Sequence, residues 1–118
     1  MEKIIKIQTD KSKIFRQWVA TLQPVIKLRD KEADVLAELL FQNNENKEFP
    51  ENKRWILIFD YSIKRLMMDK LNLSGAHFDN ILSGLRKKSI IIDNKVIKNL
   101  LFYPEEKNKI TFEFIING

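Results

Sequence analysis

The stretch LNLSGAHFDNILSGLRKKSIII, residues 71–92, carries polar side chains early and basic side chains late. Its polar or small residues are Ser74, Gly75, Ala76, His77, Asp79, Asn80 and Ser83, and its basic residues are Arg86, Lys87 and Lys88. An Asn side chain such as that of Asn80 can form two hydrogen bonds with adenine, and Lys or Arg can neutralise phosphates. These residue types are compatible with a helix that contacts nucleic acid.

Further cations lie on both sides of this stretch. They are Lys64, Arg65 and Lys70 before it, and Lys95 and Lys98 after it. These side chains could also bind phosphate. The alternative is an ordinary solvated surface, because the dipole of a helix favours Lys and Arg near its C-terminus whatever the helix contacts.

Other kinds of chemistry find little support. The chain has no Cys and one His, His77, so a zinc site built from these ligands is not expected. The carboxylates Glu32, Asp34 and Glu38 are expected on the polar, solvated face of one helix. No glycine-rich phosphate loop, nucleophile elbow or dinucleotide-binding motif is present. We therefore expect no enzymatic activity, no metal and no cofactor.

The composition is that of a single globular domain of 118 residues. Residues 1–60 carry 11 basic and 10 acidic side chains, whereas residues 61–118 carry 10 and 6, within a net charge of +5. The excess in one half is weak support for a polyanionic partner. No apolar run approaches the roughly 18 residues of a membrane span, and the N-terminus does not resemble a secretory signal.

Apolar spacing predicts the elements of the first half. IIKIQ near the start can form a strand, and from Ser12 a helix is expected that ends at Pro24. LRDKEADVLAELLFQNNEN predicts a second helix with Asp30 as its cap, ended by its Asn cluster. QNNENKEFPENK is expected to be a surface loop. WILIF, residues 55–59, fits either a buried helical turn or a strand.

In the second half, capping and turn residues mark the ends of the expected helices and strands more clearly. Asp60 is expected to cap the helix YSIKRLMMDKL, and Ser74 the helix that follows. The expected inward positions are Ile63, Leu66, Met67 and Leu71 in the first helix, and Phe78, Ile81, Leu82 and Leu85 in the second. SIIIDNKVIKNLLFYP predicts two strands joined by a turn at Asp93-Asn94, and ITFEFII predicts a final strand.

Residues 28–104 resemble the winged helix-turn-helix family, of the small phage and bacterial regulator type. Leu73-Ser74 is similar to the "(I/L)-S" that caps the family's recognition helix, and RKKSIII is similar to the ending that leads into its wing. LRDKEADVLAELL resembles the opening helix of many such domains. The resemblance implies a mainly α fold with a small β-hairpin (α+β). Outside it, residues 1–27 are expected to form an N-terminal extension and helix, and residues 105–118 a C-terminal strand, within the same single domain.

The chain departs from the family pattern at three positions. Ser89 stands where the family usually has Gly before the wing. Gly84 lies inside the predicted recognition helix and should weaken it by roughly 0.5–1 kcal/mol relative to Ala. Asp79 stands where DNA-reading members commonly carry Ser or Thr, and a carboxylate is repelled by phosphates unless it accepts from a cytosine amino group.

The resemblance implies a DNA-binding transcriptional regulator that reads the major groove with helix 74–88. The expected contacts are Ser74, Gly75, Ala76, His77, Asp79, Asn80, Ser83, Arg86, Lys87, Lys88, Lys64, Arg65 and Lys95. The expected partner is double-stranded DNA, with a homodimer or a protein partner as further options. The alternative function is an interaction or structural component, for example of a phage particle or a replication or transcription complex. The expected location is the cytoplasm, or a virion if the gene belongs to a phage.

Overall fold

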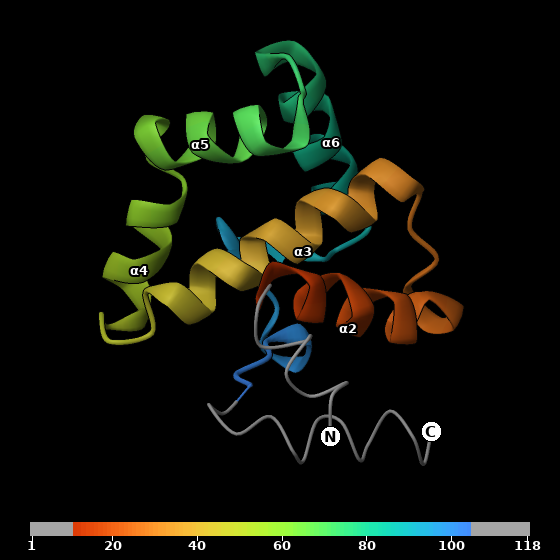
Figure 1. The fold of residues 1–118 in the computed structure, drawn as a ribbon, viewed down its shortest axis with the longest axis horizontal. Coiled ribbons are helices and arrows are strands. Elements are labelled where there is room, and N and C mark those ends of the chain that lie inside the picture. Colours follow the sequence, from red (N-terminus) through yellow and green to blue (C-terminus); the bar gives the residue numbers. More distant parts are fainter. Residues whose placement is uncertain (1–10, 105–118) are drawn as a thin grey trace.

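The computed structural model describes residues 11–104 (Figure 1). The elements are α2 (Lys11–Ile26), α3 (Asp30–Glu45), α4 (Glu51–Ile58), α5 (Tyr61–Leu71), α6 (Gly75–Lys87), β1 (Ile91–Ile92), β2 (Lys95–Val96) and the 3-10 turn η1 (Lys98–Leu100). The fold is mainly helical with a small two-stranded antiparallel sheet, so the predicted α+β class is confirmed. The strands predicted in IIKIQ and ITFEFII lie outside the described residues.

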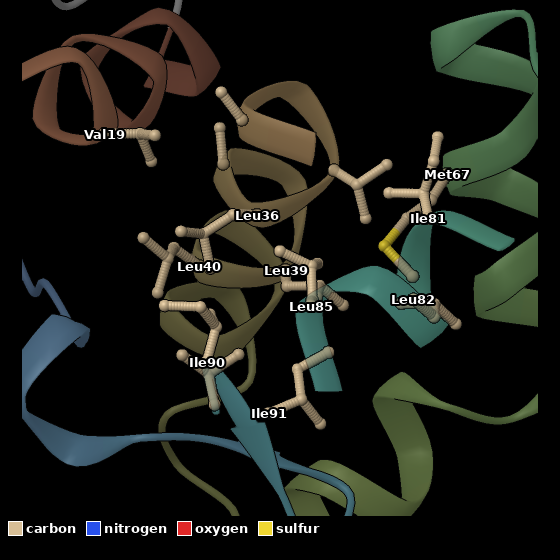
Figure 2. Packing of buried hydrophobic residues seen from close by; sticks show 14 of the residues in the cluster. Val19, Leu36, Leu39, Leu40, Met67, Ile81, Leu82, Leu85, Ile90 and Ile91 are labelled. Carbon is tan, nitrogen blue, oxygen red and sulfur yellow. The ribbon is translucent and has the colours of Figure 1, made fainter. Parts of the chain in front are cut away.

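Helix α3 runs through the middle of the molecule, with α2 along one side and α5 and α6 on the other (Figure 1). Its residues Val35, Leu36, Leu39 and Leu40 are fully buried. Figure 2 shows Leu36, Leu39 and Leu40 between Val19 of α2 and the α5 and α6 side chains. One hydrophobic core therefore positions both the N-terminal helix and the α5–α6 pair.

Helix α2 does not end at Pro24 as predicted but continues to Ile26. Proline lacks an N–H and so removes one helical hydrogen bond, but its fixed φ is compatible with one further turn. The helix ends at Lys27, which has a φ of 50° and donates its N–H to the Gln23 carbonyl at 2.8 Å. The Gln23 side chain bonds both backbone groups of Leu28, which fixes the turn into α3.

Helix α3 differs from its prediction at its N-terminal cap and ends within the predicted Asn cluster. Asp30 is the first helical residue and not the cap. Arg29 occupies the cap position, and its backbone N–H donates to Glu32 Oε1 at 2.9 Å. At the other end Asn43 and Asn44 are buried inside the helix, which ends at Glu45 with Asn46, the last Asn of the predicted cluster, as its C-cap. The predicted loop is correspondingly shorter, from residue 46 to residue 50.

The WILIF stretch is helical, since α4 covers residues 51–58. Trp55 and Ile58 are buried, whereas Ile56 is 73% exposed. The apolar run therefore has two sides, one in the core and one on the surface. In a continuous apolar run the spacing of apolar residues does not differ between a helix and a strand. The sequence therefore could not decide which of the two residues 55–59 form.

Both predicted caps in the second half are confirmed. The Asp60 side chain accepts from the Ser62 N–H at 3.2 Å, and Ser74 Oγ accepts from the His77 N–H at 3.1 Å. Leu66 was predicted to face inward but is 58% exposed, while Met68 packs against the core instead. The predicted inward residues of α6, Phe78, Ile81, Leu82 and Leu85, are all buried.

The hairpin confirms the predicted turn, with Ile91 opposite Val96 and Ile92 opposite Lys95. Asp93 and Asn94 have φ of 55° and 59°, as the two central residues of a type I′ turn require. The second strand is shorter than predicted, because residues 98–100 form the 3-10 turn. At the last residue of this turn, the Leu100 carbonyl accepts a hydrogen bond from Trp18 Nε1 at 2.9 Å, so the turn is attached to α2.

Ser89, which follows the C-cap of α6, has a φ of 60°. This left-handed backbone costs little for glycine and is uncommon for other residues. The Ser89 N–H donates to the Arg86 carbonyl at 3.0 Å, and the Ile90 N–H donates to Leu85 at 2.9 Å. These two bonds end α6 and direct the chain into β1.

Candidate nucleic-acid interface

Helix α6 presents its polar residues on an uncovered surface. The exposed positions are Gly75, Ala76, His77, Asp79, Asn80, Ser83, Arg86 and Lys87, with Lys88 following at the C-cap. Ser74 is exposed as well, but its hydroxyl accepts from the helix as the N-cap. At about 1.5 Å per residue the helix is roughly 20 Å long, so its small N-terminal residues and its basic end are far apart.

Asp79 is paired with a cation of the preceding helix. Lys64 Nζ lies 3.1 Å from Asp79 Oδ1 and joins α5 to α6. The Lys64 side chain is half-buried at 26% exposure, whereas that of Asp79 is 62% exposed. The predicted phosphate contact Lys64 and the unusual acid Asp79 are therefore one unit, which the sequence reasoning did not anticipate.

Lys88, another predicted phosphate contact, is exposed but is paired with a buried carboxylate of α3. Its Nζ lies 2.6 Å from Glu32 Oε1, and the Glu32 side chain is 10% exposed. Burial raises the pKa of Glu32, but the hydrogen bonds from Lys88 and from the Arg29 N–H lower it, and the net pKa lies below its ordinary value. The expectation that Glu32 lies on a solvated face is wrong, because the end of α6 packs over it.

The other two α3 carboxylates are paired as well. Glu38 is buried and accepts from Lys70 Nζ at 3.0 Å, and the same ammonium lies 4.6 Å from the centre of the Phe41 ring. Asp34 is half-buried and accepts from Arg16 Nε at 2.8 Å. A solvated polar face is therefore the wrong description of these carboxylates. Each binds a cation of a different neighbouring element.

Lys95 contacts helix α4. Its Nζ lies 2.6 Å from Asn52 Oδ1 and 3.4 Å from Glu51 Oε1. The hairpin is held against α4 by these contacts. Lys95 was predicted to be a cation available at the tip of the wing, but its ammonium group contacts α4 instead.

The remaining basic side chains are open to solvent. Arg65 is exposed and its closest polar contact is the Tyr61 hydroxyl at 3.4 Å. Within residues 11–104, the Arg86 and Lys87 side chains have no hydrogen-bond or ion-pair partner. The basic end of α6 consequently offers two available cations and not the three that the sequence suggests.

A shallow hollow between α4 and the hairpin turn was missed by the sequence reasoning. It is lined by Asn52, Trp55, Ile56, Phe59, Asp93, Asn94 and Lys95. The exposed Ile56 lies at this hollow, and the Ile92 side chain on β1 is 52% exposed. The only signal in the sequence was the apolar WILIF run, which exceeds what one buried face of a short helix needs.

Metal binding and membrane crossing are two further possibilities for the described residues. In residues 11–104 no group of three or more His, Asp or Glu side chains is placed to hold a metal ion. Over the same residues no helix combines the length and apolarity needed to cross a membrane.

No family model, curated protein or solved structure matches this chain. Function must therefore be argued from the contacts, burial and charges of the described residues.

Proposed function

We propose that this chain is a DNA-binding winged helix-turn-helix protein, a cytoplasmic transcriptional regulator that places α6 in the major groove. The order of the elements supports the proposal. Helices α5 and α6 are joined by the three residues Asn72, Leu73 and Ser74, and a two-stranded hairpin follows α6. This is the order of a helix-turn-helix with a wing, in which the second helix reads DNA.

The observation that carries the proposal is the uncovered face of α6. Ala76, Asp79, Asn80 and Ser83 are spaced three and four residues apart, so they share one side of the helix, and all are exposed. The opposite side is buried in the core. Small residues near the N-terminus of a recognition helix allow close approach to base edges. Asn80 is suited to adenine, through two hydrogen bonds.

Phosphate binding falls to Arg86, Lys87 and Arg65, which are exposed and not paired with acids in the described part of the chain. Lysine and arginine that are free to exchange counterions for phosphates give affinity without sequence preference. Such contacts fix the position of the helix on the duplex, and base contacts then provide specificity.

The second candidate function is a protein-interaction or structural component with the same fold. The hollow between α4 and the hairpin favours this second function, because the apolar side chains of Trp55 and Ile56 line it. Ile92 on β1 is a further exposed apolar side chain. The ion pairs favour it too, since Lys64, Lys70, Lys88 and Lys95 all bind groups within the protein. Aromatic and aliphatic side chains at a surface are typical of protein interfaces.

Backbone amide NMR distinguishes the two functions. A short mixed-sequence duplex is added to isotopically labelled protein at low salt. The DNA proposal expects the largest shifts in residues 75–87 and near Arg65, and small shifts in residues 52–59. Absence of shifts in α6, or shifts only around α4 and the hairpin turn, would reject insertion of α6 into DNA and favour the second function.

A further inference from the structure

Asp79 occupies the centre of the exposed face of α6, one helical turn after Ala76 and next to Asn80. Its Oδ1 accepts from Lys64 Nζ at 3.1 Å. Within the described residues its second oxygen has no hydrogen-bond partner. Lys64 thus contacts one oxygen of a carboxylate whose side chain is 62% exposed, and the other oxygen is not used by the described part of the protein.

The Lys64–Asp79 pair is poorly suited to stabilising the fold. Exposed ion pairs contribute little to folding because water and salt screen them, and the Asp79 side chain is 62% exposed. Two effects of the pair remain. The ion pair places a cation beside the carboxylate, and it offsets part of the negative charge that phosphates would otherwise repel.

We propose that Asp79 is a specificity-determining residue that selects cytosine in the major groove, a conclusion that rests on the proposed DNA-binding function. A carboxylate can only accept hydrogen bonds, and cytosine offers the N4 amino donor. Guanine and thymine present acceptor oxygens in the same groove, which repel a carboxylate. Adenine presents a donor beside the N7 acceptor, which an amide satisfies and a carboxylate does not.

Lys64 is the positioning residue in this arrangement. It lies on α5 and is half-buried, so its ammonium group approaches Asp79 from the side of the protein. The pair uses Asp79 Oδ1 and leaves the second oxygen of Asp79 for the base. Asn80, the next residue, does not share this partner and remains the candidate for an adjacent base.

The test uses duplexes with a randomised central segment, from which the full-length chain selects bound sequences. The parent should select cytosine at one position. Asp79→Asn has the same shape but can both donate and accept, so it should select adenine at that same position. Asp79→Ala should show no preference there. Asp69→Asn, at an exposed acid of α5 that lacks a partner among residues 11–104, is the matched control and should select as the parent does.

Fluorescence anisotropy on two duplexes that differ only at the selected position gives the magnitude. The parent should prefer the cytosine duplex by at least about fivefold, and Asp79→Asn should reverse the preference. Lys64→Gln should prefer the cytosine duplex less strongly than the parent does, but it should not reverse the preference. Circular dichroism melting checks that each variant is folded, which is expected because Asp79 is exposed.

Selection of the same base at every position by the parent and Asp79→Asn would overturn the inference while leaving DNA binding intact. Failure of the parent and of every folded variant to bind any duplex would instead overturn the proposed function. An unchanged ratio in Lys64→Gln would remove the positioning role assigned to Lys64.

Discussion

The ammonium group of Lys88, at the C-cap of α6, lies 2.6 Å from Glu32 Oε1 in the first turn of α3. The same oxygen accepts the backbone N–H of Arg29 at 2.9 Å. The other carboxylate oxygen lies 2.6 Å from the point where a Cβ on Gly84 would stand. One buried carboxylate therefore joins the start of α3 to the end of the candidate recognition helix, and Gly84 provides the space for it.

Gly84→Ala should destabilise the protein, although alanine favours helices by about 0.5–1 kcal/mol over glycine. The added methyl group would displace a carboxylate whose charge-assisted hydrogen bonds contribute roughly 1.5–3 kcal/mol each. We expect a net loss of about 1 kcal/mol, measured by urea unfolding. Gly75→Ala is the matched control, because a Cβ there would meet only Met68 Cε at an ordinary 3.6 Å. Equal stability of the two variants would contradict the close contact at Gly84.

Stability should depend on pH through Glu32. Its folded pKa lies below its ordinary value, so the unfolded chain takes up the proton first as the pH falls. The contribution of Glu32 is therefore present above about pH 5 and is lost on acidification through the folded pKa. Glu32→Gln should be less stable at neutral pH and should lose less stability below about pH 5.

Urea unfolding at several pH values measures this difference in slope. Glu45→Gln, at the exposed C-terminal end of α3, is the control and should keep the parent slope. A Glu32→Gln variant whose stability falls with pH as steeply as the parent's would show that the Glu32–Lys88 pair does not form in solution.

Two leucines test the register of the α5–α6 unit. Leu85 is fully buried and Leu66 is 58% exposed. Leu85→Ala should cost roughly 2–5 kcal/mol, whereas Leu66→Ala should change stability by about 0.5 kcal/mol or less. Thermal melting of both variants measures the contrast. Similar losses would place Leu66 in the core, as the sequence pattern first suggested.

Features that depend on residues close together in the chain could be predicted from the sequence. The starts of α5 and α6 follow from Asp60 and Ser74, because a capping side chain binds an N–H only two or three residues further along. The Asp93-Asn94 turn is equally local, since these residue types tolerate a positive φ. The inward face of α6 was also predicted correctly, because its apolar residues follow one helical period.

Long-range contacts could not be predicted. Glu32 and Lys88 are 56 residues apart, and Lys95 and Asn52 are 43 apart. A helical period identifies the charged face of α3 but does not show which elements pack against it. Glu32 and Glu38 were therefore expected in solvent. For the same reason Lys88 and Lys95 were counted as free cations, and the role of Gly84 was not visible.

The central claim is that α6 binds DNA, and the salt dependence of that binding tests it most directly. If Arg65, Arg86 and Lys87 each neutralise one phosphate, affinity for a mixed duplex should fall roughly 40-fold between about 50 and 200 mM salt. A variant with Arg86→Gln and Lys87→Gln should bind more weakly at low salt, and its affinity should fall only about 3–4-fold over the same range. A second variant with Lys31→Gln and Lys53→Gln, which removes two exposed lysines of α3 and α4, should behave as the parent. No binding by the parent at the lowest salt, or equal losses in the two double variants, would contradict DNA binding through α6.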